Sequence, residues 1–496
     1  MSTREFSRRS FGKTVGAAAA LGSGGMSSAL RLQAAAQEGS TIEGHPKENF
    51  YQFPQGFQWG CATAAYQIEG GATADGRGPS IWDTFSHKPG NTYQNETGDV
   101  ADDDYHLYKE DVQLLTALGA KIYRFSVSWT RIFPQGAGQP NEKGVDFYKR
   151  LVDELLANEI EPFCTLFHWD LPQTLQDKFG GWESRETSKA FAEYAGYVAG
   201  QLSDKVRRFF TMNEFSSFID LGYRDGKFAP GLKLAPGRLN QTRHNAVLAH
   251  GLAVQTIRAK GRPGTKVGLA ENAAVPVPVI ETEPHIKASR EAMRQLNAAY
   301  LTVIMEGKYT EQYLHNAGAN APKYTAEDLK VISSPLDFLG LNVYTPTCVR
   351  ADDSPQGFAV VKNPSSYPHM ASPWLNIGPE ALYWSPRHVN DLWKVKEIYI
   401  TENGASSADV LTPDGQVYDT DRVMYLRSYI KSLHRAVTED YPVRGYFCWS
   451  LMDNFEWADG YNLRFGLYYV DFKTQKRYPK LSAHFYKELI ARNAVV

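Results

Sequence analysis

The segment E-I-Y-I-T-E-N-G at residues 397–404 combines a predicted β-strand with a charged end. Isoleucine alternates with tyrosine and threonine, which is the period of a strand, and the following asparagine and glycine favour a turn. The strand therefore ends at Glu402. A carboxylate at the tip of an apolar strand costs free energy unless it is paired, so stability alone does not explain its position. This position indicates a site to which other strand ends contribute.

Strand-like and helix-like segments alternate along the chain from residue 57 onward. The expected strands are residues 57–65, 121–129, 161–169, 207–213, 266–270, 336–343, 397–401 and 443–451. The expected helices are residues 103–118, 144–158, 186–202, 242–259, 288–305 and 421–438. Eight strands separated by helices predict an α/β fold, a single (β/α)8 TIM barrel.

Two long segments without clear periodicity, residues 79–101 and 352–390, are expected to be loops over the C-terminal mouth of the barrel. The competing architecture is an open, doubly wound sheet. That fold needs a glycine-rich phosphate loop after the first strand, and G-C-A-T-A-A-Y-Q-I-E-G-G at residues 60–71 is not such a loop. The barrel is therefore the favoured prediction.

Composition limits the classes of function. The chain has 496 residues, a hydrophobic content of 43% that is ample for a large core, and a formal net charge of -2. This charge balance gives no indication of a nucleic-acid partner or an anionic membrane surface. The four cysteines show neither a CxxC motif nor a metal-like spacing, so neither a metal nor a cofactor is expected from them.

Seven expected strands carry polar or aromatic side chains, Arg124 within the second strand and the others at or beyond strand ends, and the C-terminal ends of barrel strands converge on one mouth. Each has an ordinary explanation on its own, since asparagine caps turns and a lone histidine is usually a satisfied core residue. Seven in one chain are harder to explain in this way. The residues are Gln67, Arg124, His168 with Trp169 and Asp170, Asn213 with Glu214, Asn342 with Tyr344, Glu402, and Trp449 followed by Glu456 and Trp457.

Two of these residues, Glu214 and Glu402, are carboxylates at the ends of the fourth and seventh expected strands. Strands so far apart in sequence lie across a barrel, so their side chains can face each other. Facing carboxylates are the groups that cleave glycosidic bonds, one as a protonated acid and the other as an ionised base or nucleophile. Arg124 is the cation expected to keep one of them ionised. The alternative is two unrelated, exposed glutamates.

These residues lie in motifs that resemble those of the retaining β-glycosidases of glycoside hydrolase family 1, and the resemblance covers residues 57–489. The motifs are Q-I-E-G at 67–70, Y-R-F-S-V-S-W-T-R-I-F-P at 123–134, F-H-W-D-L-P at 167–172, T-M-N-E at 211–214, L-G-L-N-V-Y at 339–344, I-T-E-N-G at 400–404, S-L-M-D-N-F-E-W at 450–457 and Y-N-L-R-F-G-L-Y-Y-V-D at 461–471.

The resemblance implies a role for each matching residue. Glu214 would be the acid/base and Glu402 the nucleophile, with Arg124, Asn342 and Tyr344 beside it. Trp449 would stack on the sugar ring and precede a non-proline cis peptide bond, and Trp374 would line the leaving-group side. The residues expected to hold sugar hydroxyls are Gln67, His168, Asn213, Glu456 and Trp457.

The implied activity is hydrolysis of terminal, non-reducing β-D-glucosyl residues with retention of configuration, with some action on β-galactosides or β-fucosides. The substrate would be a small β-glucoside or a short β-linked oligosaccharide. No metal or cofactor is expected, because two carboxylates supply acid, base and nucleophile. The alternatives are a catalytically silent, sugar-binding member of the fold and a 6-phospho-β-glycosidase.

The sequence departs from the family pattern in informative places. Phe215 follows Glu214 where the family usually has proline, and Val343 stands where it usually has tyrosine. The 6-phospho branch has serine, lysine and tyrosine where this chain has Glu456, Leu463 and Phe465. A carboxylate facing a phosphate would repel it, which disfavours that branch.

The N-terminus resembles a twin-arginine export signal, with S-R-R-S-F-G-K at residues 7–13, an Ala/Gly-rich stretch at 14–30 and A-A-A at 34–36. We expect residues 1–36 to be a signal peptide, 37–49 a linker and 50–496 the barrel. The protein would engage the twin-arginine machinery and be periplasmic or extracellular. The alternative is a disordered basic tail.

Overall fold

The computed structural model describes residues 51–496, and its centre is a closed barrel of eight parallel strands. All eight expected strands are present, and the prediction of a (β/α)8 barrel is confirmed. In order around the barrel the strands are β1 (Gln58–Ala62), β2 (Ile122–Ser126), β3 (Glu161–Thr165), β4 (Arg208–Asn213), β5 (Lys266–Glu271), β7 (Leu339–Asn342), β10 (Ile398–Asn403) and β11 (Val443–Trp449).

The barrel closes where β11 pairs with β1. Cys61 stands opposite Cys448 in this register, and both cysteines are free thiols with no solvent exposure. The hydroxyl of Tyr486, in the last helix, donates a hydrogen bond of 2.7 Å to the carbonyl of Gly60 in β1. The C-terminal part of the chain therefore completes the core that the first strand begins.

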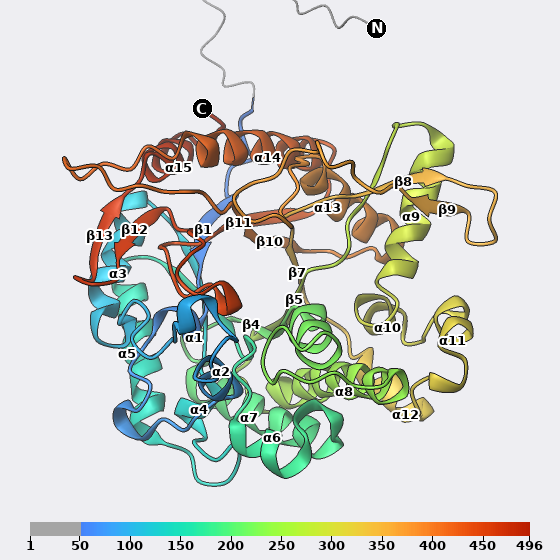
Figure 1. Cartoon of the computed structure of the whole chain (residues 1–496), viewed down its shortest axis with the longest axis horizontal. Helices are drawn as coiled ribbons and strands as arrows, with labels where there is room; N and C mark the ends of the chain where they lie inside the picture. Colours follow the sequence, from blue (N-terminus) through green and yellow to red (C-terminus); the bar gives the residue numbers. More distant parts are fainter. Residues whose placement is uncertain (1–50) are drawn as a thin grey trace, which may run out of the picture. The chain divides into compact units, whose positions relative to one another are not determined.

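The principal helices lie outside the strands, which surround the centre of the view in Figure 1. Helix α3 shows why such helices form, because Tyr108, Val112, Leu115 and Leu118 repeat at helical spacing and are buried on one face. It ends at Gly119, whose φ of 80° suits a residue without a Cβ. The helices of this layer are α3 (Asp104–Leu118), α5 (Glu142–Ala157), α7 (Arg185–Leu202), α8 (Pro236–Lys260), α9 (Glu283–Leu296), α10 (Leu301–Glu306), α13 (Ala381–Trp393), α14 (Thr420–Thr438) and α15 (Leu481–Arg492).

Three predictions about the segments between strands are wrong, and one of them is the expected loop at 79–101, which contains the short helix α2 (Ile81–Ser86). The expected helix at 288–305 is two helices, because the Asn297 amide donates to the carbonyls of Met293 and Ala274 and ends α9. The expected loop at 352–390 contains a short strand, β9 (Phe358–Val360), and most of α13, which tolerates Pro386 in its interior. Because proline normally breaks helices, the presence of Pro386 argued against a helix in this segment.

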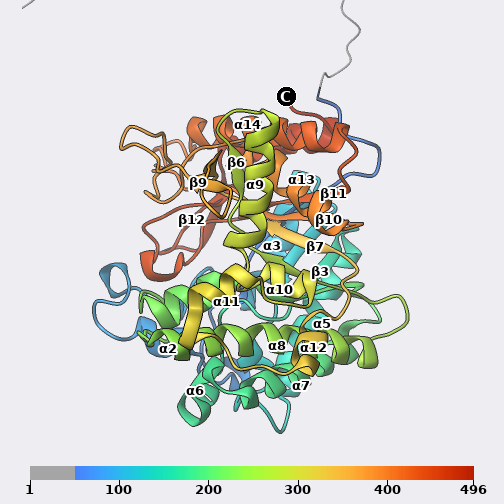
Figure 2. The same ribbon diagram turned by 90° about the vertical axis from the view of Figure 1, so that its right-hand side faces the viewer.

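Shorter helices and strands lie outside the barrel sheet. Strands β6, β8 and β9 form a small sheet, which lies beside α9 in Figure 2. No helix within residues 51–496 is long and apolar enough to cross a membrane. The remaining α-helices and strands are α1 (Ala65–Ile68), α2 (Ile81–Ser86), α4 (Trp129–Ile132), α6 (Gln173–Phe179), α11 (Glu311–Ala317), α12 (Ala326–Ile332), β6 (Pro276–Pro278), β8 (Thr347–Ala351), and a hairpin of β12 (Tyr468–Asp471) and β13 (Lys476–Pro479), and a π-helix, η4 (Ser216–Arg224), follows β4.

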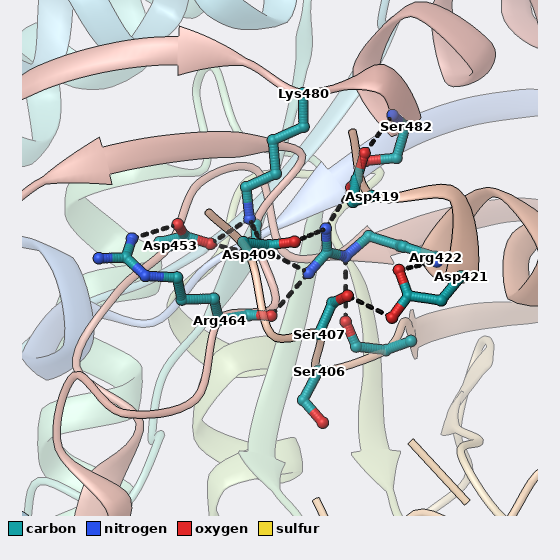
Figure 3. A network of polar contacts seen from close by, with 12 residues as sticks. Ser406, Ser407, Asp409, Asp419, Asp421, Arg422, Asp453, Arg464, Lys480 and Ser482 are labelled. Carbon is teal, nitrogen blue, oxygen red and sulfur yellow. Dashed lines mark hydrogen bonds and ion pairs between the residues drawn. The ribbon is translucent and has the colours of Figure 1, made fainter. Parts of the chain in front are cut away.

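A buried network of charges joins the segments that follow β10 and β11 (Figure 3). Arg422 at the start of α14 pairs with Asp419 and, at 2.8 Å, with Asp409. Lys480, just before α15, lies 2.5 Å from both Asp409 and Asp453. Because each buried charge has an opposite partner, the network holds these segments in one arrangement.

Candidate active site

Strands β4 and β10 bring the two predicted carboxylates to the mouth of the barrel. Glu402 lies in β10, in register with Asn342 at the end of β7. Glu214 directly follows β4, with a φ of 56° that is uncommon for a residue with a side chain. The two side chains belong to residues that are only 3% and 7% exposed, respectively. They are therefore buried carboxyls, which excludes the alternative of two exposed glutamates.

Glu402 has a cation beside it. Arg124 of β2 donates to Glu402 Oε1 at 2.7 Å, and the hydroxyl of Tyr344 donates to Oε2 at 2.8 Å. Burial raises the pKa of Glu402 above its usual value, and the Arg124 charge and the hydrogen bonds from Arg124 and Tyr344 offset part of this rise. These contacts all favour the ionised form.

Glu214 has only neutral hydrogen-bond donors. Asn342 Nδ2 donates to Glu214 Oε1 at 2.7 Å, and Ser217 Oγ donates to Oε2 at 2.7 Å. Burial, together with repulsion by Glu402, raises the pKa of Glu214 to about 8. Glu214 is therefore the member of the pair that keeps its proton at neutral pH.

Asn213 and Asn342 connect the two carboxyls into one network. Asn213 Oδ1 accepts hydrogen bonds from Arg124 at 2.5 Å and from Asn342 at 3.0 Å. The Asn213 amide also lies 3.1 Å from His168 Nε2. Residues of β2, β4, β7 and β10 and of the segment after β3 thus contact one another directly.

A second group of predicted residues lies around Gln67, which is in α1 rather than at a strand end. Gln67 Nε2 donates to Glu456 Oε2 at 3.3 Å, and to Asn454 Oδ1 and the Phe455 carbonyl at 3.0 Å. Within residues 51–496, buried Gln67 Oε1 and His168 Nδ1 have no hydrogen-bond partner. These two atoms, on residues of the same site, are available to bind a ligand.

Aromatic rings line this second group. The ring of His168 lies nearly parallel to those of Trp449 and Trp457, with centroids 5.7 and 5.9 Å away. Burial and the nearby Arg124 charge lower the pKa of His168 well below its usual value, so its ring is neutral. Burial and the neighbouring carboxylates raise the pKa of Glu456.

Two further expectations concern tryptophans. The peptide bond between Trp449 and Ser450 is cis, as predicted. Trp374 is 48% exposed and stands apart from the buried network, with its ring 5.8 Å from that of Tyr344 and 6.5 Å from that of Phe465. Trp374 therefore belongs to the outer part of the site.

Several residues of the site were not predicted from the sequence. Ser217 lies in the helical segment η4 (Ser216–Arg224) and Asn454 in an irregular segment after β11, and neither stands at a strand end. Glu271 was missed because the fifth strand was expected to end at residue 270, although a carboxylate at a strand end is the signal that revealed Glu402. No three His, Cys, Asp or Glu side chains in residues 51–496 are grouped to hold a metal ion.

A (β/α)8 barrel with paired carboxyls at its C-terminal mouth is typical of glycosidases. The model of glycosyl hydrolase family 1 matches residues 50–495, and the chain belongs to this family and is a glycosidase.

Known proteins of this kind are similar over most of their length. The chain is 43% identical over 447 residues to the 1,4-beta-D-glucan glucohydrolase of Thermotoga neapolitana, covering 90% of this chain and 99% of that protein. It is 43% identical over 450 residues to beta-glucosidase A of Thermotoga maritima, with the same coverage. The structure of the beta-glucosidase from Thermotoga maritima in complex with glucoimidazole matches with a TM-score of 0.82 and 42% identity, over 90% of this chain and all of that one.

Proposed function

We propose that this glycosidase is a retaining β-glucosidase that removes terminal, non-reducing β-D-glucosyl residues from small β-glucosides or short β-linked oligosaccharides. β-Galactosides and β-fucosides would be further substrates. The observation that carries the proposal is the asymmetry of the buried pair, because Glu402 contacts a guanidinium and Glu214 contacts only neutral donors. The names of the relatives support glucosides as the substrate class.

In the first step, Glu402 attacks the anomeric carbon while Glu214 gives its proton to the departing glycosidic oxygen. The bond from the sugar to the leaving group breaks as the bond to Glu402 forms. In the second step, Glu214 takes a proton from water, whose oxygen attacks the anomeric carbon and releases Glu402. Two displacements restore the original configuration. Carboxyl groups about 5 to 5.5 Å apart are characteristic of this mechanism.

The group around Gln67 would bind the non-reducing sugar. The free acceptor Gln67 Oε1, the free His168 Nδ1 and the Glu456 carboxyl would bind hydroxyls, together with Asn213 and Trp457. Trp449 would stack on the ring, Tyr344 and Asn342 would orient the carboxyls, and Trp374 would contact the leaving group. Neither step calls for a metal or cofactor.

The two alternative functions receive less support. A silent, sugar-binding protein has no need of both catalytic carboxyls, and both are present and connected. A 6-phospho-β-glycosidase needs cationic groups for the phosphate, whereas this chain has Glu456, Leu463 and Phe465 at the corresponding positions.

Hydrolysis of 4-nitrophenyl β-D-glucoside tests the proposal, with the β-galactoside, the β-fucoside and the 6-phospho-β-glucoside as comparisons. We expect the glucoside to be hydrolysed, the phosphorylated substrate to be refused, and Glu402→Ala to be inactive. NMR should show the β-anomer as the first product. A wild-type protein that binds glucose but hydrolyses no aryl glycoside would favour the silent reading, and an α-anomer would contradict retention.

We also propose that the protein is exported by the twin-arginine pathway to the periplasm or the extracellular space. The motif, the apolar stretch and the A-A-A site lie in residues 1–36, followed by the linker at 37–49, and all lie outside the described residues. Their order along the chain supports the proposal. Cell fractionation of wild type and of the Arg8→Lys, Arg9→Lys double variant tests it. An unchanged distribution of activity would contradict this route.

A further inference from the structure

The turn that carries Glu214 is fastened to the end of β5 by consecutive hydrogen bonds. The Glu214 N–H donates to the Ala270 carbonyl at 2.9 Å, and the Phe215 N–H donates to Glu271 Oε2 at 3.0 Å. Asn272 continues the series, because it accepts from Ser216 Oγ and donates to Ser217 Oγ, both at 3.0 Å. Residues 214–217 are thus paired with residues 270–272, one after another.

This series ends at the carboxyl group that it positions. Ser217 Oγ accepts from Asn272 and donates to Glu214 Oε2. The backbone of Glu214 is meanwhile held at a φ of 56°, a conformation that persists only where neighbouring contacts impose it. The end of β5 therefore controls both the backbone and one oxygen of Glu214.

The hydrogen bond to Glu271 depends on the residue type at position 215. Proline, the usual residue of the family at position 215, has no N–H and could not donate to Glu271. Glu271 is 2% exposed, and a buried carboxyl without its donor would be costly. Burial and the nearby Glu214 raise the pKa of Glu271 to about 8, so it is a neutral acceptor near pH 7.

We propose that Glu271 is a positioning residue for the acid/base Glu214 and acts through the backbone N–H of Phe215. The proposal rests on the function proposed above for Glu214. Glu271 does not contact the reacting atoms. It holds the turn after β4 so that the Glu214 proton faces the glycosidic oxygen, and Phe215 is the partner that makes this possible.

The test compares kcat/KM for two substrates of different leaving-group ability. Phenyl β-D-glucoside needs protonation of its leaving oxygen, whereas 2,4-dinitrophenyl β-D-glucoside releases a stable anion without it. Because a misplacement of about 1 Å can cost about 10²-fold, we expect Glu271→Leu to lose up to about 10²-fold on the phenyl glucoside. The loss on the dinitrophenyl glucoside should be several-fold at most.

Conservative and control variants separate positioning from general damage. Glu271→Gln keeps an acceptor of the same shape and should restore most of the activity on the phenyl glucoside. Val267→Ala removes a buried side chain from the other end of β5 and should affect both substrates alike. Equal losses on both substrates for Glu271→Leu, or no loss on either, would overturn the proposal.

Phe215→Pro gives an independent test, because the φ of −55° at Phe215 suits a proline ring. We expect Phe215→Pro to reproduce the selective loss in the wild type but to add little in a Glu271→Leu background, since the hydrogen bond is already absent. Additive effects would contradict the coupling.

Glu214→Ala separates the acid/base role of Glu214 from the positioning role of Glu271. If this variant retained wild-type activity on phenyl β-D-glucoside, the proposed role of Glu214 would be wrong. If it lost that activity while Glu271→Leu did not, only the positioning role would be wrong.

Discussion

Arg124 and Glu402 form an ion pair of 2.7 Å in which neither side chain is more than 4% exposed. Their strands, β2 and β10, are not neighbours in the barrel, so the pair spans its interior. Arg124 also donates to Thr165 Oγ1 at 2.9 Å, to the Thr401 carbonyl at 3.3 Å and to Asn213 Oδ1. The guanidinium is therefore held by three groups and presents one fixed edge to the carboxylate, which suits a group that must stay ionised.

Replacing Arg124 by methionine should raise the pKa of Glu402, because the charge that opposes the effect of burial is lost. The nucleophile must be ionised, so the acidic limb of the kcat/KM profile should move to higher pH, by about 1 to 3 units. Unfolding in urea should show a loss of about 3 to 5 kcal/mol from the unpaired carboxylate. Arg208→Met, which breaks pairs with Glu161 and Glu397 at the opposite end of β4, is the control. An acidic limb that moved equally in both variants would contradict this role.

The basic limb of the same profile should follow Glu214. Its pKa is raised to about 8, so kcat/KM should fall as the pH rises through this value and the proton is lost. The hydrogen bond from Ser217 lowers this pKa. Ser217→Ala should therefore move the basic limb upward by roughly half a unit to one unit. Ser428→Ala, whose hydroxyl donates only to carbonyls within its own helix α14, should leave the limb in place. A downward shift in Ser217→Ala would show that another group titrates there.

Glu456→Ala should lower kcat/KM for β-glucosides by about 10- to 100-fold, since hydroxyls of the bound sugar would lose an acceptor. Glucosides that lack the 4- or 6-hydroxyl should show a smaller loss, because they have one such bond fewer to lose. Glu488→Ala changes an exposed acidic residue of α15, away from the site, and serves as the control. Equal losses for glucosides with and without these hydroxyls would argue against the sugar-binding role.

Lys480→Met should destabilise the fold by about 3 to 5 kcal/mol, because it leaves Asp409 and Asp453 with one cation fewer in a buried site. Urea unfolding measures the effect. Lys487→Met, an exposed position in the following helix, should change stability by less than about 0.5 kcal/mol. Similar unfolding midpoints for the two variants would indicate that the buried charges contribute little.

Residues with a local pattern could be predicted from the sequence. Apolar runs revealed the barrel strands, and Glu214, Asn342 and Glu402 were recognisable because polar ends of such runs converge in a barrel. The hydrogen bond from the Phe215 N–H to Glu271 was not predictable. Every residue type except proline has a backbone N–H, and the sequence does not show which acceptor it contacts. Helix α13 was hidden by Pro386, and packing against α14 outweighs the local preference there.

The pairing of Cys61 with Cys448 places two thiols at the seam where the barrel closes. Burial raises the pKa of both thiols, so they are protonated and unreactive while β1 and β11 are paired. They become accessible only when β1 and β11 separate. The rate at which a thiol reagent modifies these two positions therefore reports the opening of the barrel itself, and it does so with no label added to the protein.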